Sequence, residues 1–101
     1  MKDDIDFVLL KAADLLEKSE WYQAGMSPDN LEGYHCPITA IRKFEFDAYA
    51  EAKACERLAQ KINPEERASG AHPNVLIMRF NDKEARSKEE VVAKMREAGK
   101  A

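Results

Sequence analysis

The stretch DIDFVLLKAADLLEKS, residues 4–19, decides the fold class of this chain. Its apolar side chains recur at the i, i+3, i+4 and i+7 spacing of one helical face, with charged residues between them. Asp3 or Asp4 can cap the first amides of such a helix. Phe7 and Leu10 widen the apolar face, so the helix is expected to contact neighbours on more than one side. The stretch therefore predicts an amphipathic helix in a mostly helical domain.

Two further helices are predicted in the middle of the chain. Pro37 suits the first position of a short helix because its missing amide hydrogen costs nothing there. Residues 47–62 predict a long helix that ends at Asn63, since the residue before Pro64 avoids the helical region. The apolar stripe expected on this second helix is Ala48, Tyr49, Ala52, Cys55, Leu58, Ala59 and Ile62.

The C-terminal third mixes polar and apolar segments. Residues 65–71 are polar and predict a loop. Residues 75–80 are short enough for either a strand or a helix, and Pro73 at a possible first helical position favours a helix. Ser87 and Glu90 form a capping box ahead of a last helix, with Gly99 as its expected stop.

Residues 20–34 lack helical periodicity. Gly25, the run 27–30 and Gly33 are turn residues, which predicts a long loop after the first helix. Aromatic rings in a loop usually fold back onto the nearest helix and anchor it. The aromatic residues Trp21, Tyr22 and Tyr34 are therefore the candidate binding residues.

Together these elements predict an all-α or predominantly α fold, a small bundle of about four helices. At 101 residues, one globular domain over residues 1–101 is expected. The predicted core is Val8, Leu9, Ala12, Leu15, Leu16, Ile38, Ile41, Ala52, Leu58, Ile62, Leu76, Phe80, Val91, Val92 and Met95.

Charge and composition argue against several classes of partner. The net charge is −3, which provides no general attraction to nucleic acid or to anionic membranes. A local basic cluster, Arg79, Lys83, Arg86 and Lys88, is interrupted by acids and predicts a solvated surface of mixed sign. The longest apolar run, residues 75–78, is far too short to span a bilayer. With an acidic start and only two cysteines, the expected setting is the cytoplasm, with both thiols reduced.

The strongest candidate for catalysis is the set Cys36, His72 and Asn81. Cys36 precedes Pro37, so its sulfur is expected at a helix N-terminus, where the helix dipole lowers a thiol pKa. The order Cys, His, Asn is that of papain-like hydrolases, in which the histidine activates the thiol. The alternative is a packed cysteine at the start of a helix, which is favoured because no Gly or Ser setting surrounds Cys36.

A zinc site built from His35, Cys36, Cys55 and His72 is the second candidate. Structural zinc sites place ligands in close pairs on turns, whereas Cys55 falls in the middle of a helix. We therefore predict no metal and, since phosphate-binding glycine loops are missing from the sequence, no cofactor.

Several short motifs resemble a family of small proteins of unknown function found in bacteria and their phages. They are Ala12-Ala13-Asp14-Leu15-Leu16, then Trp21, Gly25 and Cys36, then Phe80-Asn81-Asp82 and the run Ser87 to Val92. The chain departs from the family pattern at Phe80, where the family has Trp, and at Glu20, where it has Gly. The resemblance implies a shared fold and a phage or prophage origin, but no activity.

The function predicted from the sequence is a non-catalytic protein-binding accessory domain. The resemblance adds a phage or prophage origin, with a host protein as the target. The partner of the domain is expected to be another protein, with a homo-oligomer left open. The alternative is a small cysteine-dependent hydrolase or transferase that uses Cys36.

Overall fold

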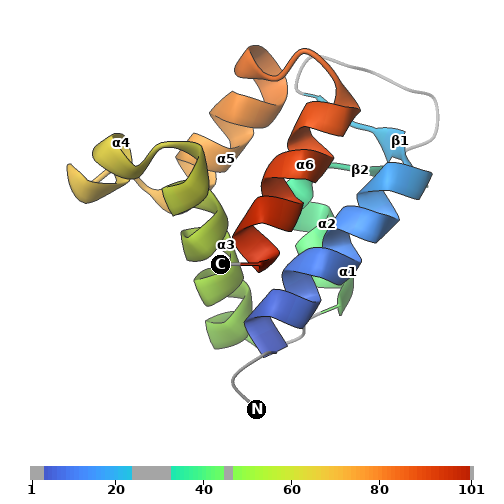
Figure 1. The fold of residues 1–101 in the computed structure, drawn as a ribbon, viewed down its shortest axis with the longest axis horizontal. Coiled ribbons are helices and arrows are strands. Elements are labelled where there is room, and N and C mark those ends of the chain that lie inside the picture. Colours follow the sequence, from blue (N-terminus) through green and yellow to red (C-terminus); the bar gives the residue numbers. More distant parts are fainter. Residues whose placement is uncertain (1–3, 24–32, 45–46, 101) are drawn as a thin grey trace.

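The first and last helices of the chain lie side by side and run antiparallel (Figure 1). They are α1 (Asp4–Lys18) and α6 (Lys88–Gly99). A computed structural model describes residues 4–23, 33–44 and 47–100. The caps predicted at Asp3 and Asp4 and the turn residues Gly25 and 27–30 lie outside the residues and side chains that it describes.

The remaining helices pack around this pair. Helix α2 (Pro37–Phe44) packs against α1, and α3 (Ala48–Ile62) contacts both α5 (Pro73–Arg79) and α6. The short α4 (Pro64–Ala68) projects from the end of α3 (Figure 1). Helix α5 continues directly into a π-helical turn, η1 (Phe80–Glu84). The predominantly α class is thus confirmed, although the described residues contain six α-helices rather than about four.

The segment predicted as a loop after α1 contains a small strand pair. The strands β1 (Glu20–Trp21) and β2 (Tyr34–His35) are parallel, with Glu20 opposite Tyr34 and Trp21 opposite His35. The Tyr22 amide donates to the His35 carbonyl at 3.0 Å. Two-residue strands are too short to leave a periodic pattern in the sequence, so periodicity could not predict them.

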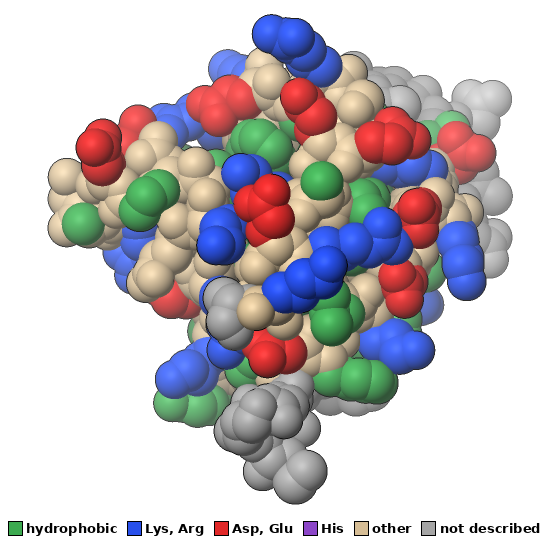
Figure 2. All heavy atoms as spheres, in the orientation of Figure 1, with side chains coloured by type: hydrophobic (Ala, Val, Ile, Leu, Met, Phe, Trp, Pro, Cys, Tyr) green, Lys and Arg blue, Asp and Glu red, His purple; other side chains and the backbone are tan. Residues whose placement is uncertain are grey.

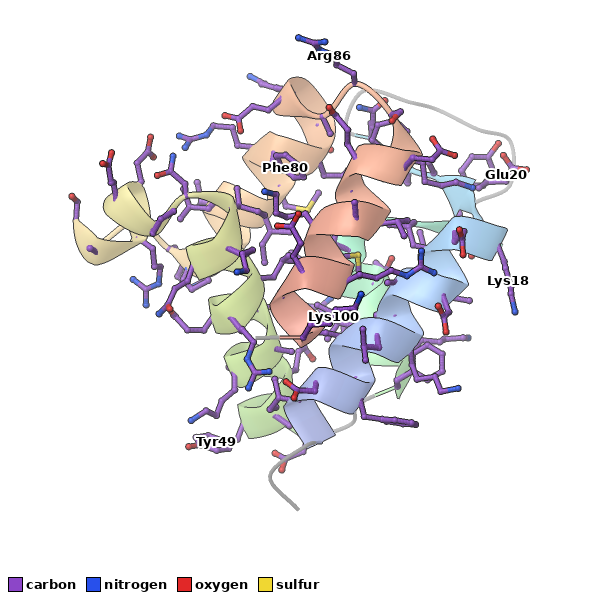
Figure 3. The ribbon with its side chains drawn as sticks, viewed as in Figure 1. Lys18, Glu20, Tyr49, Phe80, Arg86 and Lys100 are labelled. Carbon is purple, nitrogen blue, oxygen red and sulfur yellow. The ribbon has the colours of Figure 1, made fainter. Side chains whose placement is uncertain are left out.

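Most of the predicted core is buried in one hydrophobic cluster, with four exceptions. Leu15, Ile62 and Phe80 are only half-buried at the edge of the cluster, and Ala52 is exposed. Phe7 and Tyr49, expected on apolar faces, are 57% and 69% exposed. Tyr49 points away from the helices at the start of α3 (Figure 3).

The errors on α3 have one cause. Its buried face is Ala54, Cys55, Leu58 and Ala59, which shares three residues with the predicted stripe but takes in Ala54 in place of Ala52. Alanines allow helices to approach closely on any side, so the sequence of α3 defines its buried face poorly. The neighbours α5 and α6 decide which face is buried.

The polar loop predicted over residues 65–71 is wrong for its first half, where α4 forms. Asn63 ends α3 through a bond from its amide to the Ala59 carbonyl, and its side chain then accepts the Glu66 amide at 3.1 Å. Pro64 occupies the first helical position. One asparagine therefore serves as the C-cap of one helix and the N-cap of the next.

Helix α6 begins as predicted but ends without the expected glycine cap. The Ser87 hydroxyl accepts the Glu90 amide at 3.3 Å, while the Glu90 carboxylate accepts the Arg86 amide at 2.5 Å, one residue before the expected partner. Gly99 is the last residue of the helix, as predicted, but it lacks the positive φ of a glycine cap, and Lys100 is the C-cap. A Cβ there would meet the Leu10 side chain at 3.0 Å, so this glycine permits the close approach of α1 and α6.

Candidate functional site

A pocket of about 310 Å³ lies at the start of α2 and is lined, among the described residues, by Tyr22, Tyr34, Cys36 and Thr39. Two of the three aromatic residues proposed for binding thus lie beside the cysteine proposed for catalysis. We call this the α2 pocket. Tyr22 directly follows β1 and Tyr34 belongs to β2, while Cys36 and Thr39 lie at the start of α2.

The first turn of α2 fixes the position of Cys36. The Thr39 hydroxyl accepts the Cys36 amide at 3.0 Å and donates to the Cys36 carbonyl at 3.1 Å. The Ala40 amide donates to the same carbonyl. Cys36 is therefore the residue before the helix, as Pro37 predicted, but its side chain is buried and its sulfur lies 3.8 Å from the Thr39 hydroxyl.

His35 is the histidine closest to this cysteine in sequence. Its Nδ1 lies 3.2 Å from the Thr39 hydroxyl. Burial lowers the pKa of His35, and the nearby Lys43 lowers it further. Both effects disfavour the imidazolium form, which is the form that would stabilise a thiolate.

Asn81 holds in place the segment that contributes Tyr22 to the lining of the α2 pocket. Its side chain is fully buried in η1, and its carbonyl oxygen accepts the Trp21 indole N–H at 2.7 Å. Its amide nitrogen donates to the Tyr22 carbonyl and to the Asp82 carboxylate, each at 2.9 Å. The Gln23 side chain donates to the Asn81 backbone carbonyl at 3.0 Å. We call this set of contacts the Asn81 junction.

Asn81 belongs to the π-helical turn η1, and its side chain is used inside the protein. The π-helical turn places the asparagine inward, where its amide satisfies groups of a segment about sixty residues away in sequence. Trp21 packs against the core, which leaves Tyr22 and Tyr34 as the aromatic residues that line the pocket. A short Phe-Asn-Asp motif before a helix was the only sequence feature that pointed to this place.

His72 lies at a different place in the fold. It is the N-cap of α5, where its Nδ1 accepts the Asn74 amide at 3.1 Å. It lines a separate cavity of about 280 Å³ together with Cys55. Burial, followed by the charge of Glu51, raises the pKa of the Cys55 thiol to about 11, so this thiol is protonated at neutral pH.

The candidate catalytic set is thus distributed over three places. Cys36 lines the α2 pocket, His72 lines the cavity with Cys55, and the Asn81 side chain is committed to its junction. Of the four residues weighed as zinc ligands, Cys36 lines the α2 pocket, whereas Cys55 and His72 line the other cavity. Within residues 4–23, 33–44 and 47–100, no three histidine, cysteine or carboxylate side chains could hold a metal ion together.

The basic cluster near η1 is partly used inside the protein. Arg79 pairs with Glu66 at 2.7 Å and with Glu84 at 3.3 Å. The Lys88 ammonium donates to the Glu17 and Ser19 carbonyls at the end of α1. These contacts hold the helices together and agree with a mixed-sign surface. In the part of the chain that is described, no helix is long and apolar enough to cross a bilayer.

Comparison with known proteins places the whole chain in one family. No match to the chain was found among curated proteins or among solved structures. The model of a family of unknown function, DUF6197, matches residues 1–101. The chain therefore belongs to the family of unknown function DUF6197.

Proposed function

We propose that this chain is a non-catalytic protein-binding domain that receives an apolar side chain of its partner in the α2 pocket. The observation that carries the proposal is the pocket itself, about 310 Å³ with Tyr22, Tyr34 and Cys36 in its lining. Tyrosines combine a large apolar contact area with a polar tip and lose little entropy on binding, which suits a protein interface. Two tyrosines beside a small pocket fit one inserted side chain better than a flat contact.

The surroundings of Cys36 support binding over catalysis. Thiol catalysis needs a thiolate and a nearby proton carrier. Burial disfavours the imidazolium form of the neighbouring His35, which would stabilise a thiolate, and His72 lines another cavity. The alternative function, a cysteine-dependent hydrolase or transferase, would require a rearrangement that brings His72 to Cys36.

The resemblance to bacterial and phage proteins supports a more specific form of the proposal, in which a phage or prophage encodes the chain and its target is a host protein. Two buried, unpaired cysteines fit a reducing cytoplasm. The genes that flank the coding sequence test the origin: phage structural or replication genes would support it, and housekeeping genes on both sides would oppose it.

The binding role is tested by affinity capture with the immobilised chain from a lysate of the organism that encodes it. A partner retained by the wild type should be lost with Tyr34→Ala and kept with Tyr49→Ala, an exposed tyrosine on α3 that does not line the pocket. Equal retention by both variants would refute the role of the α2 pocket. Sedimentation of the purified chain separates self-association from binding to a different protein.

The catalytic alternative is tested by iodoacetamide alkylation of Cys36 against pH, in a Cys55→Ser background. The binding proposal predicts slow reaction that accelerates only on unfolding, because Cys36 is buried. Fast reaction with an apparent pKa well below that of a free thiol, lost on His72→Ala, would establish a reactive cysteine instead.

A further inference from the structure

The start of α5 is capped by a histidine side chain. The Nδ1 atom of His72 accepts the Asn74 amide at 3.1 Å, and the His72 carbonyl accepts the Leu76 amide at 3.2 Å. Pro73, the first residue of the helix, has no amide hydrogen to satisfy. The ring nitrogen therefore takes the place at the start of a helix that an oxygen of Ser, Thr, Asp or Asn usually occupies.

This hydrogen bond requires one protonation state of the ring. A backbone amide can only donate, so Nδ1 of His72 presents its lone pair and the hydrogen of the neutral ring is on Nε2. An imidazolium carries a hydrogen on both nitrogens and has no acceptor left. Protonation therefore removes this cap, whereas a hydroxyl cap does not titrate between about pH 5 and pH 8.

Three titratable groups of α3 line the same cavity of about 280 Å³ as His72: Glu51, Cys55 and Glu56. The thiol is protonated and carries no charge. Each carboxylate already has an arginine partner, since Arg42 of α2 binds Glu51 at 2.8 Å and Arg67 of α4 binds Glu56 at 2.6 Å. Acidic side chains likewise lie next to basic ones over the face of the molecule shown in Figure 2. A protonated ring that turned towards either carboxylate would still be unable to accept the Asn74 amide.

The groups on the other side of the ring oppose a positive charge at this place. The first turn of α5 contains no acidic residue, and the exposed amides at the start of a helix carry a partial positive charge. Arg67 donates to the carbonyl of Ala71, directly before His72, at 3.3 Å and brings a second cation close to the ring. The surroundings therefore do not compensate for the loss of the cap.

We propose that His72 is a proton-sensitive cap, which holds the first turn of α5 in place while its ring is neutral and releases this turn when the ring takes up a proton. The His72 side chain is exposed, so protons from solvent reach it. Leu76 and Ile77 are buried and hold the rest of α5 against the core, which confines the change to residues 72–75. This device is separate from the α2 pocket, with which its cavity shares no lining residue.

The released turn forms part of the wall of the cavity that Cys55 lines. Pro73 and Asn74 contribute to this wall together with His72. Cys55 is only 3% exposed, so its thiol is protected while the turn is in place. Release of the turn therefore opens the cavity and admits a small reagent to Cys55.

The test compares four proteins by nuclear magnetic resonance. The ring nitrogen resonances of His72 report its protonation, and the Cα shifts of residues 74–76 report the helical turn. His72→Ser provides a cap that does not titrate, His72→Ala provides no cap, and His35→Gln removes the other histidine. In the wild type and in His35→Gln, protonation of His72 should remove about half or more of the helical shift. Over the same pH range His72→Ser should keep its helical shifts, and His72→Ala should lack them throughout.

Helical shifts that persist in the wild type with a protonated ring would overturn the proposal. An equal loss in His72→Ser would also overturn it, because the cause would then be a general effect of acid. The opening of the cavity is measured at one neutral pH in a Cys36→Ser background, so that thiol ionisation is the same in each protein. N-ethylmaleimide should label Cys55 about fivefold faster in His72→Ala than in His72→Ser. Equal labelling rates would show that the cap does not control access to the cavity.

Discussion

Helices α1 and α6 contact each other through many apolar side chains and through the two ion pairs of Arg96. Residues 21–23, by contrast, are held against η1 mainly by hydrogen bonds to one asparagine, Asn81. In the helix pair, burial is spread over residues that recur with the helical period. In the Asn81 junction, a single buried amide satisfies polar groups of two adjacent residues, Trp21 and Tyr22, about sixty residues away in sequence. A truncation in the helix pair should therefore destabilise the protein in proportion to the side-chain volume removed. In the Asn81 junction, the hydrogen bonds depend on one side chain.

The largest expected effect is in the helix pair. Leu16→Ala should destabilise the protein by about 2–5 kcal/mol, because Leu16 is fully buried and its removal leaves a cavity. Urea denaturation measures the loss. Phe7→Ala on the same helix, where the side chain is mostly exposed, should change stability by no more than about 0.5 kcal/mol. Equal effects would show that α1 does not pack with the face described here.

The Asn81 junction should respond next. Asn81→Ala leaves the Trp21 indole and the Tyr22 carbonyl without their partner, at a cost of about 1–3 kcal/mol. The chain has one tryptophan, so its fluorescence reports this site directly and should become easier to quench with acrylamide. Asn74→Ala on α5 serves as the control and should leave the fluorescence unaltered. Unchanged quenching in Asn81→Ala would mean that Trp21 is held by packing alone.

A substitution at Gly99, where α1 and α6 approach closely, tests how tightly the helix pair is packed. Gly99→Ala adds a methyl group 3.0 Å from the Leu10 side chain, and overpacking should outweigh the better helix propensity by about 1–2 kcal/mol. In a Leu10→Ala background the same substitution should cost nothing, as thermal denaturation of the four proteins can measure. A cost that persists in that background would locate the strain at the Asp6 carbonyl instead.

The start of α6 should show a smaller effect. Ser87→Ala removes the acceptor for the Glu90 amide and should cost about 1 kcal/mol. Hydrogen exchange at the Glu90 amide should accelerate. Ser69→Ala, at the C-terminal end of α4, removes a hydroxyl that only donates to the Glu65 carbonyl and should leave α6 protected.

The smallest effect is electrostatic and depends on pH. Arg96 lowers the folded-state pKa of Asp14 and Glu17 below their ordinary values of 3.8 and 4.5. The stabilisation that these two ion pairs provide is therefore complete above about pH 5. It is lost as the pH falls through the folded-state pKa values of the two carboxyl groups. Arg96→Gln should flatten the acid limb of the stability curve, and Lys53→Gln should not. Because these groups are exposed, salt should reduce the difference.

The helix pair was predictable from sequence because its signals are local. Periodicity identified α1, Pro37 and Ser87 identified the starts of α2 and α6, and Pro73 favoured the helical interpretation of α5. The α2 pocket was predictable only in part. The aromatic residues and Cys36 were singled out separately, and nothing in their spacing showed that Tyr22, Tyr34 and Cys36 would share one cavity.

The sequence by itself determined where α2, α3, α5 and α6 begin and where α3 ends, because caps, prolines and the helical period act within a few residues. It also determined which chain segments can bury an apolar face. The tertiary structure alone decided which face of the alanine-rich α3 is buried, since its neighbours supply the larger side chains. It also decided that Asn81 is an internal hydrogen-bonding group and that His72 lies apart from Cys36. These outcomes depend on contacts between residues far apart in the chain, and local sequence patterns cannot predict such contacts.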